Sequence, residues 1–368
     1  MDRREFLRWS ASVLAAGLIW GALDKQRRLW PFDSGKEALY YNRLESGRVR
    51  CSLCPRTCVI ADGARGFCRT RENRDNTLYS LTYGKVCSFH TDPIEKLPLF
   101  HFLPGAKTFS LAGPGCNLTC LYCQNWQISQ ARPEDVKTFN LTPAELVKKA
   151  STEDCRIIAF TYTEPIVSYE YILDTAKTAK KYGLHTVIHT AGFINPEPLK
   201  ELAPYLSAVN VDLKGFSDQF YQKVCSGSLP EVLNTLLVLR KNKVWVEVTN
   251  LVIPTLNDSP EEISGLCRWV KQNLGSSTPV HFSRFWPSYK ITNLPATPIS
   301  TMDRIGKSAR GEWLKYVYLG NIPGHQSEDT VCPKCKNTLL SRVSYQVVAN
   351  HLKNGACGFC GEKIPGVW

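Results

Sequence analysis

The chain has 368 residues and a formal net charge of +12, with 43% hydrophobic and 21% charged residues. This length can bury one large core with small appendages, and the composition is ordinary for a soluble globular protein. The basic residues are dispersed and do not interleave with aromatic residues. Nucleic-acid binding is therefore disfavoured, whereas an anionic electron donor or protein partner is compatible with the charge.

Residues 1–30 are predicted to form a targeting segment. Arg3 and Arg4 precede an apolar stretch over residues 9–23, and this pattern resembles a twin-arginine export signal. The stretch is short for a membrane span, which needs about 20 apolar residues, and no A-x-A cleavage site follows it. We expect export or an uncleaved membrane anchor, and a surface helix on a cytoplasmic protein is the alternative.

Residues 37–105 form a cysteine-rich region punctuated by Gly and Pro. Its spacing is C-x2-C-x3-C-x9-C, made by Cys51, Cys54, Cys58 and Cys68. The short spacings and the odd total of 15 cysteines favour metal ligation over disulfides. The set predicts an auxiliary iron–sulfur cluster or a structural zinc ion, and these two fit equally well.

Residues 106–322 alternate short apolar runs with helical patterns, which predicts successive βα units and a parallel sheet. The predicted strands are 107–112, 156–162, 185–189, 208–213, 244–252 and 280–285. Thr142 and Ser259 each stand before Pro and three residues before Glu, which predicts two helix starts. Gly183 predicts the end of a helix over 171–182. The pattern fits a partial barrel or a doubly wound sheet.

A loop with three cysteines directly follows the first predicted strand. Cys116, Cys120 and Cys123 lie close together in it, and Gly113 and Gly115 permit the tight backbone path that converging sulfurs need. Three thiolates can hold a cubane of four irons and leave one iron open to a substrate or cofactor. A zinc knuckle or buried free thiols are the alternatives.

Further polar residues fall at the ends of the predicted strands, where reactive groups gather in either architecture. Glu164 follows the second strand and precedes Pro165, which predicts a functional turn. Later strands end with His189, with Asp212 and Lys214, with Asn250, and with His281 and Arg284. Facing a shared mouth, such groups can bind a polar ligand. Each one alone is as readily explained by a turn or a satisfied polar pair.

Residues 325–368 form a small tail with two C-x2-C pairs, Cys332 with Cys335 and Cys357 with Cys360. The pairs predict a tetrathiolate site, either a zinc ribbon or a rubredoxin-like iron site. Because the tail has little apolar area, the metal would supply much of its folding free energy. The other cysteines, Cys87, Cys155, Cys225 and Cys267, are isolated and are interpreted as buried core thiols.

The three-cysteine loop, with an aromatic residue before the last cysteine, resembles the cluster loop of radical S-adenosylmethionine (SAM) enzymes. Segments 92–105, 123–130, 161–165 and 364–368 are similar to the radical SAM member of the AmmeMemoRadiSam system, and more distantly to pyruvate formate-lyase-activating enzymes. The resemblance covers residues 37–368. It implies a partial (β/α)6 barrel with a SAM-chelating [4Fe–4S] cluster on the loop, between the N-terminal cysteine-rich extension and the metal-binding tail.

The resemblance also implies which residues bind SAM. Tyr122 would lie against the adenine, while Thr163 and Glu164 would bind the amino group of the methionine moiety. Lys214 and Asn250 would complete the pocket. This chain has Tyr-Thr where the family has two glycines before Glu-Pro.

By the same resemblance, the chain is expected to cleave SAM reductively to a 5′-deoxyadenosyl radical and to modify or activate a protein or peptide. A low-potential flavodoxin or ferredoxin would donate electrons, and Memo- or AMMECR-type proteins would be partners. The cytoplasmic supply of SAM and reductant opposes the export signal. A multi-cluster electron-transfer protein without SAM chemistry is one alternative, and a zinc-stapled binding module is another.

Overall fold

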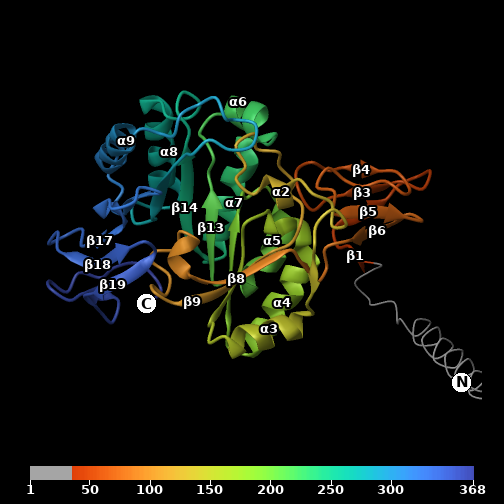
Figure 1. The fold of residues 1–368 in the computed structure, drawn as a ribbon, viewed down its shortest axis with the longest axis horizontal. Coiled ribbons are helices and arrows are strands. Elements are labelled where there is room, and N and C mark those ends of the chain that lie inside the picture. Colours follow the sequence, from red (N-terminus) through yellow and green to blue (C-terminus); the bar gives the residue numbers. More distant parts are fainter. Residues whose placement is uncertain (1–34) are drawn as a thin grey trace, which may run out of the picture.

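The computed structural model describes residues 35–368, so the targeting segment predicted at 1–30 lies outside the described residues. A central sheet with helices carries a cysteine-rich N-terminal region on one side and a small β-rich tail on the other (Figure 1). In the part of the chain that the structure describes, no helix has the length and apolar character to cross a membrane.

The central sheet has eight strands in the order β16-β15-β14-β13-β12-β11-β9-β8. The parallel strands are β9 (Lys107–Ala112), β11 (Ile157–Phe160), β12 (His185–Thr190), β13 (Ala208–Asp212), β14 (Trp245–Val252), β15 (Val280–Arg284) and β16 (Val317–Gly320). The strand β8 (Ser88–Pro93) runs antiparallel to β9. All six predicted strands are present, whereas β8 and β16 are additional. Because these two edge strands do not pair with each other, the sheet is open.

Helices connect the parallel strands and make six βα units. They are α3 (Pro143–Thr152), α4 (Tyr169–Lys181), α5 (Pro196–Leu202), α7 (Leu229–Lys241), α8 (Pro260–Asn273) and α9 (Ile299–Gly311). The predicted helix starts are confirmed, since Thr142 Oγ1 accepts from Glu145 N in a full capping box and Ser259 caps α8. Gly183 follows α4 with a φ of +70°, as the predicted left-handed cap requires.

The N-terminal region folds into two small antiparallel sheets. One contains β1 (Lys36–Glu37), β6 (Thr77–Ser80) and β5 (Arg71–Arg74), and the other contains β2 (Tyr41–Arg43), β3 (Val49–Cys51) and β4 (Val59–Ile60). A further pair joins β7 (Lys85–Val86) to β10 (Phe139–Asn140). The buried Arg71 forms an ion pair with the buried Glu170 of α4, which fixes the region against the central domain.

The tail contains a three-stranded sheet of β17 (Thr330–Val331), β18 (Thr338–Val343) and β19 (Gln346–Asn350), and a pair of β20 (Leu352–Lys353) with β21 (Ala356–Cys357). Arg342 carries its charge into the central domain, where it donates to Phe100 O (2.8 Å) and lies 3.6 Å from Glu95. A buried guanidinium needs such partners, so the tail is docked by a specific polar contact.

The last residues of the chain pair with segment 92–105. Val367 N donates to His101 O (2.8 Å), and Leu103 N donates to Val367 O (2.7 Å). The buried His101 ring lies between Pro365 O (2.7 Å) and Tyr318 Oη (2.6 Å). Segments 92–105 and 364–368, which are far apart in the sequence, are therefore one structural unit.

Burial of His101 generates a pH-dependent stability. Burial lowers the pKa of His101 from 6.5 to about 4. Between these two values the unfolded chain binds a proton that the folded chain does not, so stability falls as the pH falls. The unfolding free energy of the wild type should decrease from pH 7 to pH 5, and we expect this decrease to be smaller by about 2 kcal/mol in His101→Gln. The exposed His90→Gln is the control, and an unchanged slope in His101→Gln would contradict the assignment.

Candidate functional site

The carboxyl ends of the parallel strands surround a cavity of about 490 Å³. Its lining includes the three loop cysteines, and side chains from the ends of β12, β13, β14 and β15. This volume is in the usual range for a small-molecule or cofactor site. The position matches the expectation for parallel α/β proteins, in which ligands bind at the carboxyl edge of the sheet.

All three loop thiols line this cavity. Leu118 N donates to Cys116 Sγ (3.3 Å), and Ser129 Oγ, at the end of α2 (Trp126–Ser129), lies 3.2 Å from Cys123 Sγ. Burial raises the pKa of the Cys116 and Cys123 thiols, with the Glu164 carboxylate adding to the rise at Cys116. N–H and O–H donors to sulfur, convergence on one cavity and burial all fit thiolate ligation of an iron–sulfur cluster.

Gly115 is the point at which the loop touches the N-terminal region. Its φ is +94°, and a Cβ there would lie 2.3 Å from Thr70 Cγ2 and 2.9 Å from Cys68 O. No side chain fits in this space, and the left-handed backbone also favours glycine. Gly115 N additionally donates to Ile128 O (2.9 Å). The tight path predicted from the two glycines is therefore present at this residue.

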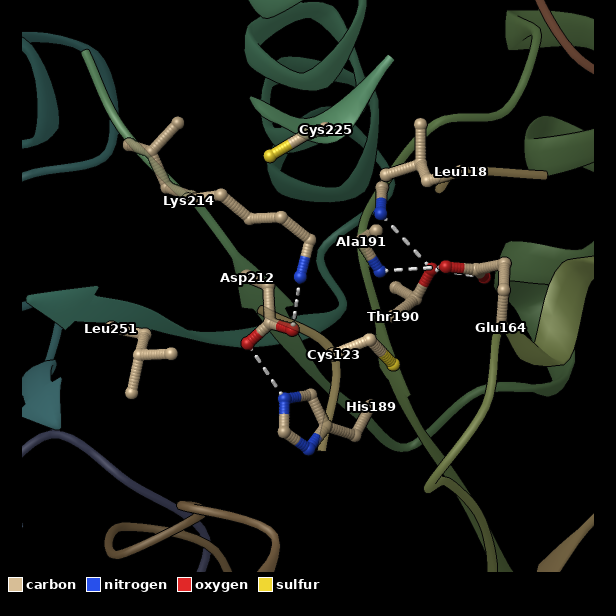
Figure 2. Close-up of polar contacts among 12 residues, drawn as sticks. Leu118, Cys123, Glu164, His189, Thr190, Ala191, Asp212, Lys214, Cys225 and Leu251 are labelled. Atoms are coloured by element: carbon tan, nitrogen blue, oxygen red, sulfur yellow. Dashed lines mark hydrogen bonds and ion pairs between the residues drawn. The ribbon is translucent and has the colours of Figure 1, made fainter. Parts of the chain in front are cut away.

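Glu164 is buried at the end of β11 and lines the cavity. It accepts hydrogen bonds from Thr190 Oγ1 (2.6 Å) and Ala191 N (2.8 Å), as Figure 2 shows. Burial raises its pKa although these donors oppose the rise. The carboxylate is thus held rigidly by β12, with its position set before any ligand arrives.

The turn before Glu164 keeps a glycine-like backbone without glycine. Tyr162 has a φ of +67°, which is unusual for a bulky residue. Its hydroxyl bonds to Asp92, and its carbonyl accepts from Asn125 Nδ2 (2.7 Å) of the cysteine loop. Thr163 Oγ1 donates to Gly113 O (2.7 Å) and lines the cavity. These contacts compensate the strain and join the turn to the loop.

Lys214 and Asp212 form a partly buried charge pair at the end of β13. Lys214 Nζ donates to Asp212 Oδ2 (2.9 Å), and His189 Nε2 lies 2.8 Å from Asp212 Oδ1 (Figure 2). Burial alone would raise the pKa of Asp212, but Lys214 and His189 outweigh it and hold that pKa well below its usual range. At neutral pH the pair is ionised, and the three side chains line the cavity beside the cysteines.

Tyr122 and Asn250 occupy the wall in different ways. Tyr122 is buried against Phe220, with 6.4 Å between ring centroids, and it lines the cavity. Asn250 is also buried, but its Nδ2 donates to Leu213 O (2.8 Å) and its residue is not part of the cavity lining. Asn250 therefore ties β14 to the end of β13, while its contact with SAM stays a prediction.

Cys225 was interpreted from the sequence as an isolated core thiol, and it is buried. It also lies beside the three-cysteine loop, at the end of the helical turn Tyr221–Cys225 that follows α6 (Asp218–Phe220). Its Sγ is 3.6 Å from Tyr122 Oη, and its hydrogen bond lowers the pKa of Cys120 to about 7. No spacing in the sequence links Cys225 to the loop, because the contact depends on how this turn packs.

The four tail cysteines converge as predicted. Their sulfurs all lie within 4.8 Å of one another, with 3.7 Å between Cys332 and Cys360 and 3.6 Å between Cys335 and Cys357. A zinc–sulfur bond of about 2.3 Å places tetrahedral ligands about 3.8 Å apart. The group can therefore bind a single metal ion. The four cysteines of the N-terminal region line a separate small cavity together.

Comparison with known proteins identifies relatives of this chain. A sequence model described as the radical SAM superfamily matches residues 111–269. The uncharacterized protein MJ0808 from Methanocaldococcus jannaschii is 46% identical over 331 residues, which cover 89% of this chain and 98% of that protein. The pyruvate formate-lyase-activating enzyme from Clostridium pasteurianum is 29% identical over 180 residues, 46% of this chain and 71% of that enzyme.

Solved structures are also similar. A radical SAM methyltransferase from Sphaerobacter thermophilus matches with a TM-score of 0.46 and 17% identity, over 60% of this chain and 67% of that one.

The contact at Gly115 yields a prediction about stability. We expect Gly115→Ala to lower the unfolding free energy by about 1–3 kcal/mol more than Gly63→Ala, because it adds overpacking to backbone strain. Gly63 is a matched control, since it has a φ of +69° and a Cβ added there would meet nothing within 4 Å. Denaturant unfolding under anaerobic conditions measures the difference. Equal losses in the two variants would show that the loop tolerates a side chain.

Proposed function

We propose that this chain, which belongs to the radical SAM superfamily of enzymes, generates a radical from SAM and directs it to a protein or peptide substrate. The observation that carries the proposal is the convergence of Cys116, Cys120 and Cys123 on one cavity of about 490 Å³. Three thiolates leave one iron of a cubane without a protein ligand, and the cavity offers space for a second group beside it.

The residues of the site have separate tasks in this proposal. Cys116, Cys120 and Cys123 would hold the [4Fe–4S] cluster. A reduced cluster there would supply the one electron that cleaves the C5′–S bond of bound SAM into methionine and a 5′-deoxyadenosyl radical. The rigid carboxylate of Glu164 and the ammonium of Lys214 are suited to bind the oppositely charged ends of a methionine moiety.

A large substrate is supported by the surface beside the cysteine loop. Trp126 and Trp286 are exposed by 40% and 46%, and the Trp126 ring stacks on Tyr289 with 5.3 Å between centroids. The segment with Trp286 and Tyr289 lies against the cysteine loop, because Lys290 N donates to Leu121 O (2.9 Å). Exposed aromatic residues are typical of surfaces that bind other proteins. The activating enzymes among the relatives are named for action on another protein, pyruvate formate-lyase.

The partners follow from the same chemistry. Radical generation requires a low-potential electron donor of the flavodoxin or ferredoxin type, and the net charge of +12 is suited to such acidic proteins. The resemblance to the AmmeMemoRadiSam system supports Memo- or AMMECR-type partners.

The zinc-ribbon interpretation of the tail is supported by its sulfur spacing.

Cys120→Ala tests the catalytic proposal. We expect the variant to lose at least about 100-fold in 5′-deoxyadenosine formation after dithionite reduction, because two thiolates do not retain the cluster. Cys87→Ala is the control, since Cys87 is half-buried and does not line the cavity of the loop cysteines. Liquid chromatography of anaerobic reactions with SAM measures the product. Undiminished cleavage in Cys120→Ala would refute the cluster assignment, and no cleavage in the reconstituted wild type would favour an electron carrier or a zinc-bound scaffold.

Cys225→Ala tests whether the fourth iron of the proposed cluster lacks a protein ligand. The thiol of Cys225 interacts directly with the thiol of Cys120. Two thiolates that bind different irons of one cluster are not in contact, because the cluster core lies between them. We therefore expect the variant to keep its iron and sulfide content, its SAM-dependent change in the electron paramagnetic resonance spectrum, and its SAM cleavage. If this spectral change appears only after Cys225 is removed, Cys225 is a fourth ligand and the proposal fails.

A further inference from the structure

The four cysteines of the N-terminal region lie around a cavity of their own. Cys51, Cys54, Cys58 and Cys68 all line it, together with apolar atoms of Leu53, Ile60 and Val167. Cys51 is at the end of β3, and its N–H donates to Cys58 O (2.9 Å), so the hairpin of β3 and β4 helps to fix the set.

The spacing of these thiols differs from that of the tail. The tail sulfurs are in contact at 3.6 and 3.7 Å, as a single tetrahedral ion requires. Elsewhere in residues 35–368, no group of three or more potential ligands converges closely enough for one ion. The N-terminal thiols instead surround a space. Ligands of a cubane cluster are held apart in this way, because four irons and four sulfides lie between them.

Hydrogen-bond donors and positive charge also face this cavity. Thr70 Oγ1 donates to Cys68 Sγ (3.2 Å), and Arg71 Nη1 donates to Cys51 Sγ (3.8 Å). Arg71 is buried, lines the cavity and pairs with Glu170 through one nitrogen, while its Nε has no hydrogen-bond acceptor. Arg56, also in the lining, makes no ion pair with a carboxylate among the described residues. Buried donors and cations of this kind stabilise an anionic thiolate cluster.

The site is directly behind the three-cysteine loop. Asn117, which follows Cys116 in the chain, lines the N-terminal cavity, and its carbonyl accepts from Arg56 Nε (2.5 Å). The carbonyl of Cys68 in turn lies against Gly115. The segments that carry the N-terminal cysteines and the loop cysteines are therefore in direct contact.

From these observations we infer that Cys51, Cys54, Cys58 and Cys68 bind a second [4Fe–4S] cluster, fully ligated by cysteine, next to the site proposed for SAM. A zinc ion, the other ligand compatible with the spacing of the sequence, would require the thiols to be in contact.

The inference is tested on the full-length protein in which Cys116, Cys120 and Cys123 are all replaced by Ala. After anaerobic reconstitution with iron and sulfide, we expect about four iron and four sulfide per chain, against about eight of each in the wild type. Reduced samples should show the electron paramagnetic resonance signal of a [4Fe–4S]⁺ cluster that does not change with SAM. Bound zinc without sulfide in the triple variant would overturn the inference.

A second variant guards against failure of the triple variant to fold. Cys54→Ser with Cys68→Ser, in a chain with the loop cysteines intact, should lower iron and sulfide from about eight to about four and keep the SAM-dependent signal. Cys155→Ser with Cys267→Ser is the matched control, because both of these thiols are buried outside the cavity. Wild-type iron in the first pair contradicts the second cluster. Absence of SAM cleavage in the wild type would contradict only the proposed function, since the triple variant is scored by iron and sulfide alone.

Discussion

The close contact between the cysteine loop and the N-terminal region is the constraint on which the rest of the site depends. Gly115 approaches the backbone of Cys68 so closely that no Cβ fits between them. Arg56 adds hydrogen bonds to Asn117 O on the loop and to Ser226 O. The loop is thus held from two sides before a cluster is bound. Preorganisation of ligands by packing lowers the cost of assembling a metal site.

The interior near the cavity is held by charged groups as well as apolar contacts. The buried Glu247 of β14 accepts from Phe100 N (3.0 Å), His101 N (2.8 Å) and the ring of His281 (2.7 Å). Arg342 of the tail donates to the carbonyl of Phe100 from the other side. Because a buried charge without partners is costly, these groups fix segment 92–105 in one position. The tail and this segment are consequently held together by polar contacts.

The positions of six central strands and the cysteine groups could be predicted from the sequence because their signals are local. A strand of four to eight apolar residues, a Thr142 cap or a C-x2-C pair is visible within a short window. The edge strands β8 and β16 were missed because an edge position follows from pairing between distant segments. Likewise, nothing in the sequence shows that Cys225 lies beside Cys120 or that Tyr162 has a glycine-like φ. These features are set by tertiary packing, which overrides local preference.

The three groups of cysteines differ in their burial and in the positively charged side chains beside them. The loop cysteines line the central cavity together with Lys214, whose side chain is 13% exposed and whose charge interacts with Asp212, Cys120 and Cys225. The N-terminal cysteines have Arg56 and Arg71 in their cavity wall. The tail group reaches the surface, since Cys360 is exposed, and water can screen its charge there. A thiolate site in the interior needs a cation from the protein, because the desolvation of an unpaired anion costs more than packing returns. The loop cysteines and the N-terminal cysteines both have cations in their cavity walls, where Lys214 and Arg71 also pair with Asp212 and Glu170, whereas Arg56 makes no ion pair with a carboxylate among the described residues.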